Sequence, residues 1–173
     1  MDTRPVLYIF VGFPGAGKTS IAKFIHQHSN AVHIWSDRER QRMFGYPTHS
    51  LKESQTLYLA LNIKTEDLLK EGKSVIYDTN FNYQSDRNLM KSITDKCGAD
   101  LKLIWVTTPK EVARSRALEH THRDRNGYII TMSEKEFNHL CDHTEIPTED
   151  EHPIKIDGTT FNEEDIRRKL KLN

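Results

Sequence analysis

The amino-acid sequence predicts a three-layer α/β fold, in which a mainly parallel sheet of five strands lies between layers of helices. Two observations predict it: short apolar segments alternate with longer segments of helical periodicity, and no repeat or linker divides the 173 residues. We expect one domain, residues 1–173. The expected strands are residues 5–11, 31–36, 73–78, 101–107 and 153–157. The expected helices are residues 17–29, 38–44, 51–71, 84–97, 109–121, 133–142 and 161–171.

Capping sequences mark where several helices begin. The segment Thr108-Pro109-Lys110-Glu111 combines an N-cap residue, a first-turn proline and a capping-box glutamate. The S/T-x-x-E pattern occurs again from Ser133 to Glu136 and from Thr160 to Glu163. These sequences predict that helices start close to residues 109, 133 and 161.

A glycine-rich segment directly after the first strand fits the phosphate-binding pattern G-x-x-x-x-G-K-[ST]. Its residues are Gly12, Phe13, Pro14, Gly15, Ala16, Gly17, Lys18 and Thr19, and Ser20 follows them. In such a P-loop the glycines let backbone N–H groups approach phosphate oxygens, Lys18 reaches the β- and γ-phosphates, and Thr19 offers a hydroxyl to Mg²⁺. A turn before an ordinary helix is the alternative, but the preceding strand and the amphipathic helix that follows favour a nucleotide site. We therefore expect a P-loop NTPase fold of the nucleotide-kinase type, with ATP and Mg²⁺ bound at residues 12–20.

Charged residues follow the second strand, where ligands of open α/β sheets bind. Asp37 is a candidate general base for an attacking hydroxyl, and Arg40 is a candidate ligand of an anionic substrate. Each has an alternative. Ser36 and Glu39 fit a capping box in which Asp37 only favours the first helical turn, and Arg40 is a solvated charge.

The third strand ends in Asp78, followed by Thr79-Asn80. An acidic residue at the end of an apolar strand suits the Mg²⁺ shell of a P-loop protein, so Asp78 and Thr19 are the expected metal residues. The alternative is a turn carboxylate that caps the next helix.

Arginines late in the chain are candidates for neutralising a transferred phosphoryl group. The polar segment 120–131 contains Asn126-Gly127 and predicts a flexible lid, which we place at residues 114–132. Arg123 and, second to it, Arg116 are the expected catalytic arginines. An exposed helix face and loop are the alternative for this run of charges.

Composition limits the partners. The chain has 25 basic and 25 acidic residues, so its net charge of zero does not indicate nucleic acid, although a local basic patch is compatible with one. Two cysteines, both expected to be buried free thiols, indicate a reducing compartment. No segment resembles a signal peptide or a membrane span, so we expect a cytoplasmic protein that binds no membrane. The sequence does not predict the oligomeric state.

With these sites in order, the chain resembles P-loop kinases of the polynucleotide-kinase type, a group that includes zeta-toxin-like kinases. The P-loop, Asp37 with Arg40 three residues later, Asp78-Thr79-Asn80 and the lid arginines carry the resemblance. It implies that Asp37 is the general base, Arg40 orients the substrate, Asp78 lies near magnesium, and Arg123 or Arg116 contacts the transferred phosphate. The sequence departs from the group at Ser36, where polynucleotide kinases often have another arginine, and in a longer lid spacing.

The leading hypothesis is an ATP-dependent kinase that transfers the γ-phosphate to a hydroxyl, with the 5′-hydroxyl of a polynucleotide as the acceptor that the resemblance implies. A kinase of a sugar, nucleoside or other metabolite is the first alternative. A nucleotide-dependent switch or binding module is the second, although the chain lacks the N-K-x-D sequence that reads guanine. The acceptor itself is not predicted.

Overall fold

The computed structural model describes residues 4–119, 123–124, 129–130 and 132–172. Its main sheet has five strands in the order β2-β3-β1-β4-β7, and every neighbouring pair is parallel. The strands are β1 (Val6–Val11), β2 (Val32–Trp35), β3 (Val75–Asp78), β4 (Asp100–Val106) and β7 (Ile154–Ile156). The predicted three-layer fold with a five-stranded parallel sheet is therefore confirmed.

Seven α-helices are present in the described part of the chain: α1 (Lys18–Gln27), α2 (Ser36–Phe44), α3 (Leu51–Lys70), α4 (Gln84–Cys97), α5 (Lys110–Glu119), α6 (Glu134–Asp142) and α7 (Glu163–Leu170). Three short elements were not predicted. They are a two-stranded antiparallel pair, β5 (Arg123–Asp124) with β6 (Ile129–Ile130), and a 3₁₀ turn, η1 (Glu149–Glu151).

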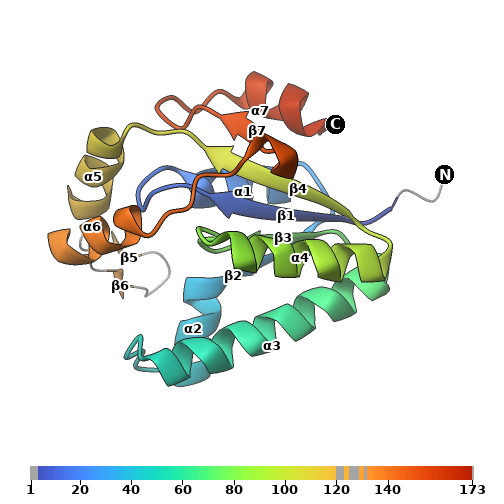
Figure 1. Cartoon of the computed structure of the whole chain (residues 1–173), viewed down its shortest axis with the longest axis horizontal. Helices are drawn as coiled ribbons and strands as arrows, with labels where there is room; N and C mark the ends of the chain where they lie inside the picture. The colour runs from blue at the N-terminus through green and yellow to red at the C-terminus, as the bar shows by residue number, and fades with distance from the viewer. Residues whose placement is uncertain (1–3, 120–122, 125–128, 131, 173) are drawn as a thin grey trace.

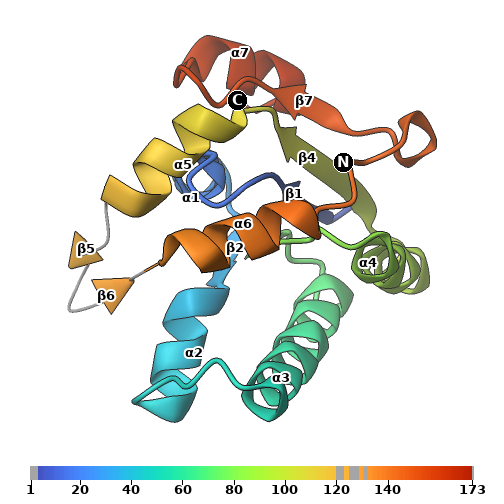
Figure 2. The same ribbon diagram turned by 60° about the vertical axis from the view of Figure 1, so that its left-hand side comes forward.

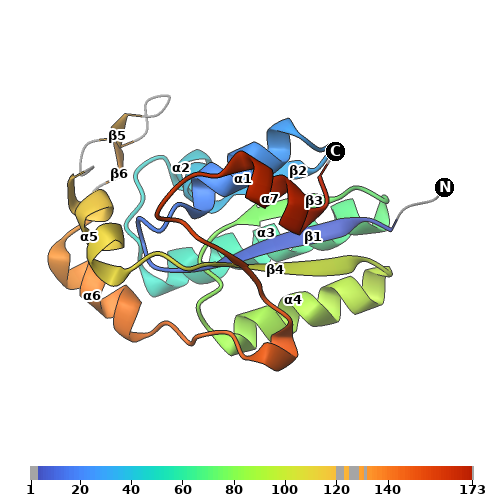
Figure 3. The same cartoon turned by 90° about the horizontal axis from the view of Figure 1, so that it is seen from above.

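Alternating side chains of β1 build the core on both faces of the sheet. Tyr8 and Phe10 belong to a buried cluster with residues of α1 and α7, whereas Leu7, Ile9 and Val11 belong to a second cluster with residues of α3 and α4. Successive side chains of a strand point to opposite faces, so a strand buried on both faces is apolar at almost every position. Figures 1 and 3 show the resulting layers, with α1 and α7 on one face of the sheet and α3 and α4 on the other.

The capping predictions had mixed outcomes. Ser133 and Glu136 form the predicted capping box at the start of α6. The box at Thr160 is wrong, because Asn162 is the N-cap residue of α7 and accepts a hydrogen bond from the Asp165 amide. The alternative box at Ser36 is also wrong, because Trp35 is the N-cap residue of α2 and Ser36 is already helical.

Elements at the carboxyl end of the sheet surround the end of β1. Figure 2 shows α5 and α6 side by side at this end, with α2 and α3 next to each other below them in this view. Phe137 and Cys141 of α6 pack with Ala113 of α5 and with Phe13 of the P-loop segment. Cys141 is buried and Cys97 is half-buried, and both are free thiols. Within the described ranges, no helix is long and apolar enough to cross a membrane.

Candidate active site

The loop between β1 and α1 is held in a conformation that requires glycine. Gly15 has a φ of +79°, and a Cβ atom there would lie 2.2 Å from the carbonyl oxygen of Ala113 in α5. Gly17 has a φ of +108° and is the N-cap residue of α1. Positive φ values and close backbone approach are the two reasons why such a loop needs glycine. The amide end of α1 is therefore open toward an anion.

Lys18 lies at the start of α1 and is nearly buried, with 8% of its surface exposed. Its Nζ donates hydrogen bonds to the carbonyl oxygens of Gly12 (2.7 Å) and Phe13 (2.8 Å). Burial lowers the pKa of the Lys18 ammonium to about 8, against the opposing charges of Asp78 and Asp37. The Lys18 ammonium therefore lies beside the loop where a phosphate would bind, and the carboxylates of Asp78 and Asp37 are near it.

Asp78 ends β3 beside Thr19. The Thr19 hydroxyl donates to Asp78 Oδ1 at 3.3 Å, and His33 Nε2 lies 3.1 Å from Asp78 Oδ2. A buried carboxylate and a hydroxyl are hard oxygen ligands of the kind that Mg²⁺ prefers, so the donor set fits the ion. The sequence did not single out His33. Its place two residues before the end of β2, adjacent to β3, is the only signal that could have found it.

Asp37 is half-buried in the first turn of α2, two residues after the end of β2. Burial raises the pKa of its carboxyl and Asp78 raises it further, whereas Arg40, His49 and Lys18 act in the opposite direction. A carboxylate of raised pKa is a stronger base than a solvated one. The influence of Lys18 and Asp78 on this carboxyl shows that the three predicted residues come together.

Arg40 does not project from α2 as a solvated charge. It is 5% exposed, and its guanidinium donates to Glu53 Oε1 (2.7 Å) and to the Ser54 hydroxyl (3.3 Å) in α3. Burial would raise the pKa of Glu53, but hydrogen bonds from Thr48 and from Arg40 outweigh it and hold that pKa at about 2. The Arg40–Glu53 pair joins α2 to α3. A contact between Arg40 and a substrate stays a prediction.

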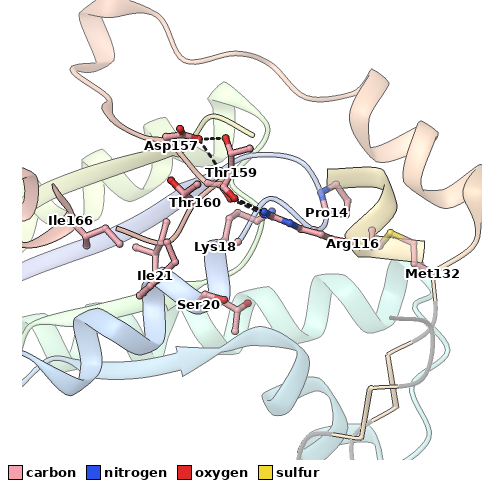
Figure 4. A pocket seen from close by; sticks show the side chains of 16 residues that line it. Pro14, Lys18, Ser20, Ile21, Arg116, Met132, Asp157, Thr159, Thr160 and Ile166 are labelled. Atoms are coloured by element: carbon pink, nitrogen blue, oxygen red, sulfur yellow. Dashed lines mark hydrogen bonds between the residues drawn. The ribbon is translucent and has the colours of Figure 1, made fainter. Parts of the chain in front are cut away.

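A cavity of about 450 Å³ lies beside the P-loop and is shown in Figure 4. Its walls are P-loop residues, α5 and the loop that follows β7. Arg116 crosses it and donates to the carbonyl oxygens of Gly158 (2.6 Å) and Thr159 (2.7 Å). The predicted role of Arg116 at the transferred phosphate stays a prediction, and its observed contacts connect α5 to this loop.

The sequence did not predict that the loop after β7 belongs to the site. A Cβ atom at Gly158 would lie 2.3 Å from the carbonyl oxygen of Ala16 and 2.2 Å from the Thr108 hydroxyl. That hydroxyl donates to the carbonyl oxygen of Ala16 at 2.8 Å, and its predicted capping of α5 stays a prediction. A glycine directly after the last predicted strand was the available signal, because close backbone contacts favour glycine at such ends.

The structure describes only part of the predicted lid. Arg123 lies in β5, which pairs with β6, but its side chain is outside the described residues, as is the whole of residues 125–128. The catalytic role of Arg123 therefore stays a prediction.

This fold and this loop define a P-loop NTPase with a kinase-like arrangement of elements. A family model described as an AAA domain, AAA_33, matches residues 7–147, and the chain belongs to that family. The match spans the P-loop, Asp37, Asp78 and the predicted lid, residues 114–132. A search of curated proteins found no match.

Solved structures share the fold. A sugar kinase from Janibacter sp. HTCC2649 is 18% identical with a TM-score of 0.66, over 98% of this chain and 94% of that chain. A chain of the Pnkp1/Rnl/Hen1 RNA repair complex is 24% identical with a TM-score of 0.66, over 80% of this chain and 43% of that chain. The APS kinase CysC of Mycobacterium tuberculosis, solved with AMPPNP and APS, is 18% identical with a TM-score of 0.53, over 81% of this chain and 97% of that chain. Such identities establish a common fold with kinases and leave the acceptor undetermined.

Proposed function

We propose that this protein is an ATP-dependent kinase that transfers the γ-phosphoryl group to a hydroxyl. The observation that carries the proposal is the convergence of Lys18, Thr19 with Asp78, and Asp37 at the carboxyl ends of adjacent strands. Phosphoryl transfer needs a cation on the β- and γ-phosphates, oxygen ligands for a metal, and a base near the attacking hydroxyl. These four residues supply those groups from one edge of the sheet.

In the proposed reaction the acceptor oxygen attacks the γ-phosphorus atom and forms a new P–O bond. The bond between that phosphorus and the β,γ-bridging oxygen breaks, ADP leaves, and the hydroxyl proton passes to the carboxylate of Asp37. Lys18 leaves its two carbonyl acceptors to bind phosphate oxygens. Mg²⁺, held by Thr19 and Asp78, would neutralise charge on the β- and γ-phosphates.

The cavity crossed by Arg116 is the proposed place for the base and ribose of ATP, because P-loop residues, the first turn of α1 and the loop after β7 line it and Asp78 does not. APS kinase, one of the similar structures, was solved with the ATP analogue AMPPNP. The kinases of similar fold differ in their acceptors, so the residues of this chain's own acceptor site would determine its acceptor.

A transfer assay with γ-labelled ATP and a panel of hydroxyl compounds tests the proposal. The panel includes an oligonucleotide with a free 5′-hydroxyl, a nucleoside and a sugar, and we expect label to move to at least one of them. Lys18→Ala should fold, as thermal unfolding would show, and lose transfer because the phosphates lose their cation. A folded Lys18→Ala protein that keeps most of the activity would contradict the proposal.

A further inference from the structure

A second cavity, of about 280 Å³, lies between α3, α4, α6 and the segment that follows β3. Four of its walls are aromatic side chains: Tyr58, Tyr77, Phe81 and Tyr83. Tyr77 and Phe81 are buried and meet edge to face, whereas Tyr58 and Tyr83 are 36% and 44% exposed. A small cavity with partly exposed aromatic walls fits one ring-sized molecule better than a polymer.

This cavity lies next to residues of the P-loop site. Thr79 directly follows Asp78, and its hydroxyl lies 3.3 Å from the Tyr58 hydroxyl. Asn82 is 4% exposed, and its Oδ1 accepts a hydrogen bond from the Gly12 amide at 3.5 Å. A molecule in the cavity would therefore lie beside both the first P-loop residue and the end of β3.

Asn82 also has an unused donor. Within the described ranges, its Nδ2 has no hydrogen-bond partner although it is buried. A buried polar group without a partner costs free energy, so such groups in native proteins generally have a role. Asn82 lines the cavity, so an oxygen atom of a bound molecule would satisfy this donor once the side chain turned toward it.

The charges around the cavity disfavour an anion. Neither arginine nor lysine is among the described residues that line it, and His143, whose Nδ1 lies 2.7 Å from the carbonyl oxygen of His139, is the basic side chain there. Arg40 is occupied by Glu53 and Ser54, and Arg87, 3% exposed, donates to Glu151 and to the carbonyl oxygens of Phe81 and Glu145.

Two carboxylates lie on the same side. Asp86 lines the cavity, and burial followed by the charge of Glu145 raises the pKa of Asp86. Both carboxylates would repel a phosphate or carboxylate group of a ligand, because like charges brought together cost free energy.

We infer that the cavity between α3, α4 and α6 is the acceptor site, and that it takes an uncharged, ring-bearing hydroxyl compound such as a nucleoside or sugar. This inference rests on the proposed kinase function. The ring lies between Tyr58 and Tyr83, Asn82 Nδ2 donates to one of its oxygens, and the reacting hydroxyl faces the P-loop. A nucleic-acid 5′ end, which carries a phosphate next to its first nucleoside, is disfavoured.

Two pairs of probes test the charge preference: thymidine with thymidine 3′-monophosphate, and glucose with glucuronate. Each anionic member keeps the ring; the nucleoside pair shares a free 5′-hydroxyl, and the sugar pair shares the free hydroxyls at C1 to C4. We expect the neutral member of at least one pair to bind, by calorimetry, and to accept label from ATP about tenfold or more better than its anionic partner.

Three variants sharpen the test. Asp86→Asn should narrow the preference for the neutral member, whereas Asp95→Asn on the same helix, whose carboxylate is exposed and pairs with Lys91, should leave it unchanged. Asn82→Asp keeps the acceptor for the Gly12 amide but removes the donor. It should weaken binding of the neutral acceptor by about tenfold, the usual scale for a lost buried hydrogen bond, while ATP still binds.

The outcomes separate the two proposals. A preference for the anionic member overturns the inference and leaves the kinase function intact. Binding of a neutral member that depends on Asn82, without any transfer to any acceptor, supports the cavity and contradicts the kinase function. If no neutral member binds, or if Asn82→Asp binds it as the wild type does, the cavity is not the acceptor site.

Discussion

Replacing Gly15 with alanine tests the packing of the P-loop against α5. Gly15 has a φ of +79°, and its added Cβ atom would lie 2.2 Å from the Ala113 carbonyl oxygen and 2.9 Å from the Ala117 amide nitrogen. Both are backbone atoms of a helix, so neither can turn aside as a flexible side chain can. Gly72 offers a matched control, since its φ is +74° and no atom lies within 4 Å of the added Cβ.

The expected costs follow from this difference. Gly72→Ala carries the left-handed backbone penalty alone, about 1–2 kcal/mol. Gly15→Ala carries the same penalty plus about 1–3 kcal/mol for overpacking. For a chain of this size about 2–4 °C of Tm is lost per kcal/mol. Gly72→Ala should therefore lower Tm by about 2–8 °C, and Gly15→Ala should lower it about twice as much.

Thermal unfolding and calorimetric titration with ATP measure both effects. Gly15→Ala should also lose most of its ATP affinity, because the loop has to move away from α5, whereas Gly72→Ala should bind ATP like the wild type. Equal Tm values for the two variants, together with unchanged ATP binding by Gly15→Ala, would refute the close approach of the P-loop to α5.

Three further predictions concern the charged residues. Asp37→Asn should lower the rate of transfer by about 10²–10⁴-fold with little change in ATP affinity, and a loss of only a few-fold would show that Asp37 is not the base. Arg116→Ala should raise KM for ATP more than it lowers kcat, because the Arg116 guanidinium holds the loop that lines the proposed ATP cavity. Arg123→Ala should mainly lower kcat. The opposite result for the two variants would exchange the roles of these arginines. Glu53 has a pKa of about 2 in place of 4.5, so its contribution to stability is present above pH 4.5 and is lost as the pH falls toward 2. The free energy of unfolding of Glu53→Gln, measured with urea, should depend less on pH in that range than that of the wild type. The same pH dependence in both proteins would contradict the pairing of Glu53.

The fold was predictable because local patterns carry it. Strand β1 lies at the centre of the sheet and is buried on both faces, so its apolar run identifies it without knowledge of its neighbours. The P-loop was equally predictable, since every constrained position in it serves backbone geometry or phosphate contact within one short segment. Helix α4 was predicted with the observed bounds for the same reason, a complete apolar periodicity that ends at Gly98.

Contacts between distant segments were not predictable. The Oε1 atom of Glu53 binds Arg40 across 13 positions of the chain, and the Gly12 amide binds Asn82 across 70. The sequence singled out neither Glu53 nor Asn82. Only the folded topology brings these residues together, because the segments join at the carboxyl ends of β1, β2 and β3.

The two predicted substrate and catalytic arginines that the structure describes are both engaged with the protein itself. Arg40 joins α2 to α3, and Arg116 joins α5 to the loop after β7. Arg40 and the buried carboxylate of Glu53 together carry no net charge, so the pair attracts a phosphate less than a free arginine would. In the proposed acceptor site, therefore, the tyrosines and Asn82 would recognise an uncharged ring. On the phosphate side, Lys18 is a described cation at the P-loop, and the proposed kinase reaction would take a second one from Arg123 or Arg116.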